Sequence, residues 1–254
     1  MLLRRITKHV NDQNWFAIGI DFVIVVVGVF IGIQVSNWNE RLEFAKREDA
    51  LMLELRAEIV QNLADVQAKG DAFLIGAASA RRVLNTAARG TASCAEDCWS
   101  ILVDLMHASQ WQQIMSNWSI YEELRREGLP SDRQVIELVE KYKTYAHQVA
   151  IVLSTQPYYR TLVRRLIPID VQDAYWQHCY SLEEAIELYR YPCPVPDDLS
   201  IDPAKVDEIL ANPEIVPALR EWTSIARVVG TTLTEPQKAL GEDILRRIDG
   251  DAGE

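Results

Sequence analysis

Histidine is scarce in this sequence: only four of the 254 residues are histidine. The chain also contains no HExxH zinc motif, no G-x-S-x-G nucleophile turn, no glycine-rich phosphate loop and no C-x-x-C pair. His107 lies one turn after Asp104 on a predicted helix, but an isolated histidine is more often structural than catalytic. The sequence therefore predicts no catalytic residue, no metal site and no cofactor, and it favours a non-enzymatic protein.

Clusters of lysine and arginine are also missing, apart from pairs such as Arg164-Arg165, and the formal net charge is -11. Affinity for nucleic acid depends mainly on clustered basic side chains, so we expect no nucleic-acid partner. The chain has no internal repeat and no low-complexity tract, and no strand pattern competes with the helical patterns. These absences favour an all-α fold of ordinary globular composition.

Paired acids and helical aromatic residues are the remaining candidates for a site. The acid pairs occur where solvated helix faces are expected. These pairs are Glu122-Glu123, Glu137 with Glu140, and Glu183-Glu184. The aromatic residues are able to line a pocket, but aromatic side chains on helices usually belong to the core. They are Trp111, Trp118, Tyr158, Tyr159, Tyr175 and Trp176.

One long apolar run lies near the N-terminus. Between Trp15 and Val35 the only charged residue is Asp21. An apolar stretch of about 20 residues crosses a bilayer as a helix, because the backbone polar groups must be satisfied within the segment. Trp15 and Trp38 bracket the run, as residues of the two membrane interfaces do. We therefore predict a transmembrane helix over residues 15–36, with the lipid bilayer as its partner.

The alternative interpretation of this run is a cleaved signal peptide. The run is longer than the usual apolar region of such peptides, and residues 34–38 offer no cleavage site of small residues. We therefore expect the helix to be retained. Residues 1–14 place Arg4, Arg5 and Lys8 opposite apolar side chains, which predicts a basic amphipathic segment suited to an anionic cytoplasmic leaflet.

One face of the predicted span carries small residues together with its single acid. At about 100° per residue, Gly28 and Gly32 fall within about 20° of Asp21, with Val25 between them and Ser36 within about 60°. A GxxxG pair lets two helix backbones approach closely, so this face predicts contact with a second copy or with another membrane helix. Asp21 is either a functional ionisable group or an acid near the helix N-terminus within reach of the headgroups.

The four cysteines are Cys94, Cys98, Cys179 and Cys193. In an oxidising compartment the economical pairing is Cys94 with Cys98 and Cys179 with Cys193, although other connectivities are allowed. Four free thiols are one alternative, and a zinc site made by all four thiolates is another that the spacing disfavours. Together with the basic segment, disulfides favour an N-terminus in the cytoplasm and a domain outside it.

Beyond the span, helical patterns dominate. Residues 37–90 predict a long amphipathic juxtamembrane helix, with an interruption at Gly70 and a stop at Gly90. Residues 91–249 predict a helical extracytoplasmic domain that packs as a bundle, and residues 250–254 a flexible tail.

Capping residues and prolines set the expected helix boundaries in that domain. Ser131 is an N-cap candidate and Pro157 a probable break in the helix that follows it. Ser181 and Glu184 form a capping-box pair that predicts a further helix, ended by the proline-rich residues 191–196. The helices expected before this one cover 98–109, 117–127, 131–166 and 170–179.

The last helices are expected to open at proline. Asp202-Pro203 and Asn212-Pro213 each place a cap residue before a proline at the first helical position. Pro236 either starts or kinks the final helix.

The span and its exit resemble a family of uncharacterised bacterial single-pass membrane proteins. The resemblance rests on the run from Asp21 to Gln34 and on Asn37-Trp38-Asn39-Glu40, and it covers residues 15 to 60. Members share an acidic residue, a Val/Ile-rich span with Gly and an Asn-Trp-Asn-Glu exit. The resemblance implies a location in the bacterial envelope and contributes no catalytic residue.

We therefore expect a membrane-anchored, non-enzymatic interaction or scaffold protein of the bacterial envelope that self-associates through its span. Its N-terminus is expected in the cytoplasm and its helical domain in the periplasm. The sequence does not identify a ligand. One alternative is a force- or proton-coupled accessory subunit in which Asp21 titrates. Another is a periplasmic ligand-binding or enzymatic domain, which would show a concave aromatic pocket with converging acids or His107.

Overall fold

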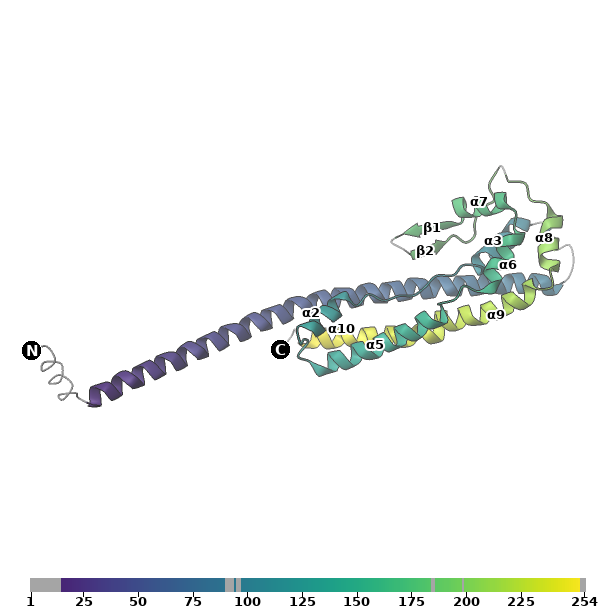
Figure 1. The fold of residues 1–254 in the computed structure, drawn as a ribbon. Coiled ribbons are helices and arrows are strands. Elements are labelled where there is room, and N and C mark those ends of the chain that lie inside the picture. Colours follow the sequence, from purple (N-terminus) through teal and green to yellow (C-terminus); the bar gives the residue numbers. More distant parts are fainter. Residues whose placement is uncertain (1–14, 90–93, 95–96, 184–185, 198, 252–254) are drawn as a thin grey trace, which may run out of the picture. The chain divides into compact units, whose positions relative to one another are not determined.

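A computed structural model describes residues 15–89, 94, 97–183, 186–197 and 199–251 (Figure 1). The described chain is mostly helical, as the sequence predicts. It divides into two compact units, Met1–Leu53 and Glu54–Glu254. The predicted basic segment 1–14, the side chain of Trp15 and residues 252–254 lie outside the described residues.

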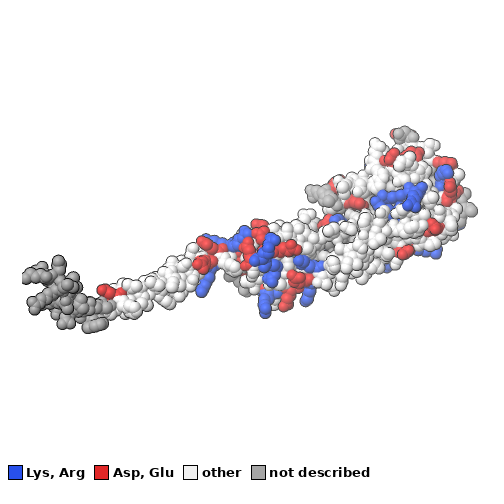
Figure 2. Space-filling model, in the orientation of Figure 1, with Lys and Arg blue, Asp and Glu red and all other residues white. Residues whose placement is uncertain are grey.

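One helix makes up the described part of the first unit. Helix α2 (Trp15–Arg89) begins here, and its apolar side chains from Ile20 to Val35 are exposed, with Phe22 69% exposed and Val25 63% exposed. No residue from Phe22 to Asn39 is charged, and Figure 2 shows the uncharged surface of this helix as a white stretch. The helix is long and apolar enough to cross a membrane.

The second unit buries the apolar side chains that α2 contributes to it. Leu55, Ile59 and Val66 recur at helical spacing, and all three are buried. The helix continues through Gly70, where an interruption is predicted, and a side chain at this position would meet Thr234 at 3.5 Å. A side chain would therefore fit at this position in ordinary van der Waals contact, and Gly70 does not end the helix.

The remaining helices of the second unit pack in pairs. Helix α5 packs against α10, α6 against α9, and α3 against α6, α7 and α8 (Figure 1). The break expected at Pro157 is confirmed, because α6 begins at the next residue. The helices are α3 (Cys98–Ala108), α4 (Ser119–Arg126), α5 (Arg133–Val152), α6 (Tyr158–Leu166), α7 (Ile169–His178), α8 (Pro203–Ala211), α9 (Ile215–Val228) and α10 (Glu235–Asp251), with a π-helical turn η1 (Val229–Leu233) before α10.

Aspartate side chains start three of these helices. Asp97, Asp132 and Asp202 each accept a hydrogen bond from a backbone N–H in the first turn of α3, α5 and α8. The prediction for Asp202-Pro203 is confirmed, because Pro203 is the first residue of α8. The N-cap of α5 lies one residue beyond the predicted Ser131, because the carboxylate of Asp132 accepts the bond.

Helices α9 and α10 depart from the predicted ends. Asn212 Oδ1 accepts a bond from the backbone of Glu214 at 2.9 Å, and α9 begins only at Ile215. Pro213 therefore lies in the turn before the helix, not at its first position. Pro236 lies in the first turn of α10, and this helix continues to Asp251, so the first two residues of the predicted tail are helical.

Helix α4 is capped by a residue of another helix. Its own N-cap residue, Trp118, contributes no side-chain hydrogen bond. The carboxylate of Glu58, on α2, accepts bonds from Ile120 N at 3.0 Å, Tyr121 N at 3.3 Å and Ser119 Oγ at 3.1 Å. A buried acid of α2 therefore satisfies the free N–H groups at the start of α4.

A β-hairpin stands where a helix is predicted. Strand β1 (Tyr180–Glu183) pairs antiparallel with β2 (Ile186–Tyr189), with Tyr180 opposite Tyr189. The helix predicted from Ser181 and Glu184 is therefore wrong, as is the expectation that no strand forms. The rings of Tyr180 and Tyr189 stack across the strands, and Trp176 packs edge-on against Tyr180 at 4.8 Å between centroids. These contacts outweigh the local capping preference.

Candidate functional site

The predicted contact face lies on the exposed helix of the first unit. A Cβ atom added at Gly28 or at Gly32 would meet nothing within 4 Å. Val25 and Asp21, on the same face, are also exposed. None of the residues that the structure describes covers this face, and its contact with a second helix stays a prediction.

The distal end of the uncharged stretch is marked by Trp38 and Glu40. Trp38 is exposed, as a residue at a membrane interface would be in a chain without its bilayer. Ser36 Oγ donates to Glu40 Oε1 at 3.4 Å, so this hydroxyl has a partner within its own helix. The interface role of Trp38 stays a prediction, and the side chain of Trp15 lies outside the described residues.

Both predicted disulfides are present in the second unit. Cys94 is bonded to Cys98, and Cys179 is bonded to Cys193. This pairing leaves neither free thiols nor thiolates for a zinc ion among these four residues. Disulfides persist in oxidising compartments, so the bonded cysteines fit a location outside a reducing cytoplasm.

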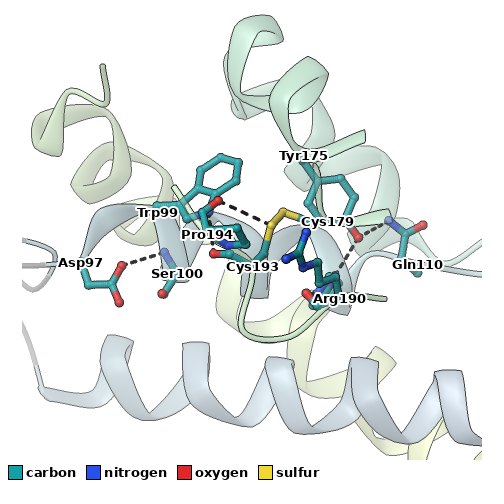
Figure 3. Close-up of a disulfide and its surroundings, with 10 residues drawn as sticks. Asp97, Trp99, Ser100, Gln110, Tyr175, Cys179, Arg190, Cys193 and Pro194 are labelled. Atoms are coloured by element: carbon teal, nitrogen blue, oxygen red, sulfur yellow. Dashed lines mark hydrogen bonds between the residues drawn. A yellow bond between two sulfur atoms is a disulfide. The ribbon is translucent and has the colours of Figure 1, made fainter. Parts of the chain in front are cut away.

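The Cys179–Cys193 bond closes a compact region around the proline-rich loop (Figure 3). The backbone N–H of Arg190 donates to the carbonyl oxygen of Cys179 at 2.9 Å. The indole Nε1 of the buried Trp99, on α3, donates to the carbonyl oxygen of Cys193 at 3.0 Å. The end of α7, the end of the hairpin and α3 are thus joined by one covalent bond and two hydrogen bonds.

His107, weighed above with Asp104 as a catalytic candidate, is a fully buried member of a hydrogen-bond chain. The Arg190 carbonyl oxygen can only accept, so His107 Nε2 carries the ring proton and donates to it at 3.2 Å. His107 Nδ1 therefore accepts from the Tyr175 hydroxyl at 2.7 Å, and that hydroxyl accepts in turn from Gln110 Nε2 at 3.0 Å. Burial lowers the pKa of His107 to about 4, so the ring is neutral and structural at physiological pH.

Asp104 does not serve His107 as a carboxylate partner. Its two oxygens accept from Arg82 instead, at 2.6 Å from Nη2 and 2.8 Å from Nε. This fork-to-fork pair joins α2 to α3. The Arg82 guanidinium also lies 4.1 Å from the centroid of the Tyr191 ring. Asp104 and His107 do lie one turn apart on α3, as the sequence predicts, but their side chains form hydrogen bonds with different partners.

Arg160 and Arg164 lie one turn apart on α6 and hold the loop after α3. Arg160 Nη1 donates to the Ser109 carbonyl oxygen at 2.9 Å, and Arg164 Nη2 donates to Gln110 Oε1 at 3.0 Å. Burial lowers the pKa of both guanidinium groups, that of Arg164 to about 10 with a further contribution from the charge of Arg160. In the sequence, Arg164 was considered only as a pair with its neighbour Arg165. The informative signal was the four-residue spacing of Arg160 and Arg164, which places both on one face of a helix.

The six aromatic candidates lie in different places and do not line one pocket. Trp118 packs against Tyr142 at 5.2 Å between ring centroids, where α4 meets α5. Tyr175 and Trp176 pack together near the hairpin, and Arg164 lies 5.0 Å from the Trp176 ring. Tyr159 is buried in the core. Tyr158 is exposed, and its hydroxyl donates to Glu214. Trp111 borders a small hollow beside Phe73 and Trp222.

Most of the paired acids that the structure describes are exposed, on α4, α5 and strand β1, while Glu123 is half-buried. Glu122 lies 3.7 Å from Lys143 Nζ, and Glu140 accepts a bond from the Tyr121 hydroxyl. Glu137 and Glu183 are exposed, and Glu184 lies outside the described residues. Among the described residues, no group of three His, Cys, Asp or Glu side chains is placed to hold a metal ion.

A hollow of about 340 Å³ lies beside the hairpin and is bordered by His178, Tyr180, Ser181 and Tyr189. It is lined by mixed polar and aromatic groups, and the acids described above do not converge on it.

Comparison with family models, with curated proteins and with solved structures finds no match for this chain.

Proposed function

We propose that this chain is a single-pass protein of the bacterial inner membrane whose second unit acts in the periplasm as a non-enzymatic interaction or scaffold module. In this proposal the N-terminus is cytoplasmic, and the helices of the second unit form a bundle. The chain self-associates through the face that carries Asp21, Val25, Gly28, Gly32 and Ser36.

The observation that carries the proposal is the outward-facing apolar helix with an open glycine face. In water such a surface would be costly, at about 25 cal/mol per Å² of apolar area. In a bilayer the apolar side chains contact lipid, and packing of small residues becomes the main source of helix–helix affinity. Gly28 and Gly32 have the free space that a second backbone requires.

The two disulfides support placing the second unit outside the cytoplasm. Thiol labelling of intact and permeabilised cells, with and without reductant, tests this compartment. We expect all four cysteines to resist labelling until reductant is added. Four freely reactive thiols in the mature protein would contradict the periplasmic location.

Replacing both Gly28 and Gly32 by Ile tests self-association. A Cβ atom at either position meets nothing within 4 Å in the described part of the chain, so the fold should be retained while the close approach of two helices is blocked. We expect the wild-type chain to be larger than a monomer in mild detergent by light scattering, and the double variant to be a monomer.

A matched control is Gly19→Ile. Gly19 also has open space around it, but it lies about 160° from Asp21 on the helix. This variant should keep the wild-type mass. An unchanged mass in the double variant, or an equal loss in the control, would reject association through the glycine face.

A further inference from the structure

A groove in the second unit brings together arginines that are far apart in the sequence. Its lining residues come from α2, α9 and η1, and its volume is about 450 Å³. Arg81 borders it from α2, and Arg220 and Arg227 border it from α9. All three side chains are exposed. The sequence shows no such cluster, because Arg81 is more than a hundred residues from the other two.

Helical spacing directs the α9 residues into the same groove. Arg220, Ser224 and Arg227 follow one another at intervals of four and three residues, so they share one face of the helix. Arg81 and Leu84 are three residues apart on α2 and face them across the groove. The three guanidinium groups therefore border one concave surface.

The three groove arginines lack acidic partners among the described residues. Other arginines of this unit have them: Arg82 binds Asp104, and Arg56 binds Asp249. The chain has 37 acidic and 26 basic residues, so carboxylates for such pairs are plentiful. Three like charges gathered without a counter-charge repel one another, and an anion placed between them relieves that repulsion.

The other polar groups of the groove are suited to the same kind of ligand. The hydroxyls of Thr223 and Thr231 are engaged with the backbone carbonyl oxygens of Leu219 and Arg227. Ser224, between the two α9 arginines, makes no side-chain hydrogen bond within the described chain, so its hydroxyl is able to donate to a ligand oxygen. Leu84 adds an apolar wall that carbon atoms of a ligand can contact.

We propose that this groove binds a ligand that carries two or more phosphate groups. Guanidinium forks bind phosphate oxygens through paired N–H donors, and several donors converge best on a group whose oxygens surround one atom. The high positive charge favours a multiply charged anion over a single carboxylate. The phosphates come either from a soluble polyphosphate compound or from the headgroup of an anionic lipid.

Titration calorimetry on the full chain in an uncharged detergent tests the proposal with two probes. Inorganic tripolyphosphate represents the soluble source, and a water-soluble short-chain phosphatidylinositol 4-phosphate, whose headgroup carries two phosphates, represents the lipid source. We expect saturable binding of at least one probe, and the tighter of the two identifies the source. Tricarballylate, which carries three carboxylates, should bind about tenfold more weakly than the better phosphate probe.

The double variant Arg220→Gln with Arg227→Gln should weaken binding about tenfold or more, because each lost guanidinium removes charge-assisted hydrogen bonds. The matched control is Arg126→Gln with Arg165→Gln, which removes the same charge from exposed positions outside the groove. The control should bind within about twofold of wild type at physiological salt, where distant charges are screened. Circular dichroism confirms that both variants retain their helices.

Three outcomes would overturn the proposal. The first is no saturable binding of either phosphate probe by the wild-type chain. The second is equal weakening in the groove variant and in the control, which indicates a response to net charge alone. The third is tricarballylate binding as tightly as the phosphate probes, which removes the preference for phosphate.

Discussion

Helix α2 carries apolar side chains along its whole length, but those of the uncharged stretch from Phe22 to Asn39 are exposed, whereas the second unit buries several of its own. In the first unit Phe22 and Phe30 are exposed, whereas in the second Leu55 and Ile59 are covered completely. The charged residues differ as well: none occurs from Phe22 to Asn39, while the second part of the helix has charges between its apolar positions. Periodicity of charge, more than apolar content, therefore distinguishes the part of α2 that packs against protein from the part that leaves its apolar side chains exposed.

The strongest way to break this comparison is to put charges into the uncharged stretch. Val26→Arg with Phe30→Arg should cost about 6 kcal/mol of insertion free energy, since an arginine near the bilayer centre costs about 3 kcal/mol. Carbonate extraction of membranes should then release most of the protein. Leu53→Arg, at an exposed position of α2 beyond the stretch, serves as the control and should stay in the membrane fraction. Retention of the double variant would contradict a transmembrane location.

The second test compares two leucines on the same helix. Leu55 is fully buried, and Leu53 is 68% exposed. Leu55→Ala should lower the free energy of unfolding by about 2 to 5 kcal/mol, because it removes apolar contacts and leaves a cavity. Leu53→Ala should change it by less than about 0.5 kcal/mol. Chemical denaturation of the two variants measures the difference, and similar values would show that the second unit does not pack as described.

A third test concerns the buried imidazole of the second unit. The pKa of His107 is about 4 in the folded chain and near 6.5 when unfolded, so the unfolded state binds the proton more readily. The contribution of His107 is present above the unfolded pKa and is lost as the pH falls towards the folded pKa. Wild-type stability should fall by about 2 kcal/mol between pH 7 and pH 5 relative to His107→Gln. The nearby charges of Asp104 and Arg82 shift the pKa of His107 in opposite directions, Asp104 upward and Arg82 downward. Parallel pH profiles for the two proteins would contradict the lowered pKa of His107.

The smallest expected effect concerns a helix start that the sequence alone predicts. Asp202 Oδ1 accepts the bond from Ala204 N at 2.9 Å, so Asp202→Ala should lower stability by about 1 kcal/mol. Asp202→Asn keeps an acceptor at the cap and should lose only a few tenths of a kcal/mol. Thermal unfolding followed by circular dichroism distinguishes the two variants. Equal losses would mean that the charge, and not the accepted bond, starts α8.

Elements with local signals could be predicted from the sequence. The apolar run, the Asp202-Pro203 start and the break at Pro157 each depend on residues adjacent in the chain. The cysteine pairs were also predictable, because each pair is close in sequence.

Elements set by distant contacts could not. The hairpin replaces a helix because Trp176 and the paired Tyr180 and Tyr189 pack together, and a capping box contains no information about those rings. The groove arginines meet only after α9 has packed beside α2. Asp104 pairs with Arg82 of helix α2 and not with His107 of its own helix. Local patterns therefore placed most helices but not the polar sites between them.

The capping of α4 by Glu58 has a consequence for how the chain is made. Ribosomes synthesise α2 before α4, so the acid that receives the N–H groups of Ile120 and Tyr121 is already present when those residues emerge. A circular permutant that begins at α4 would reverse this order, so that Ile120 and Tyr121 would be synthesised before the carboxylate that caps them. The order of the two helices along the chain therefore sets which partner of this contact is made first.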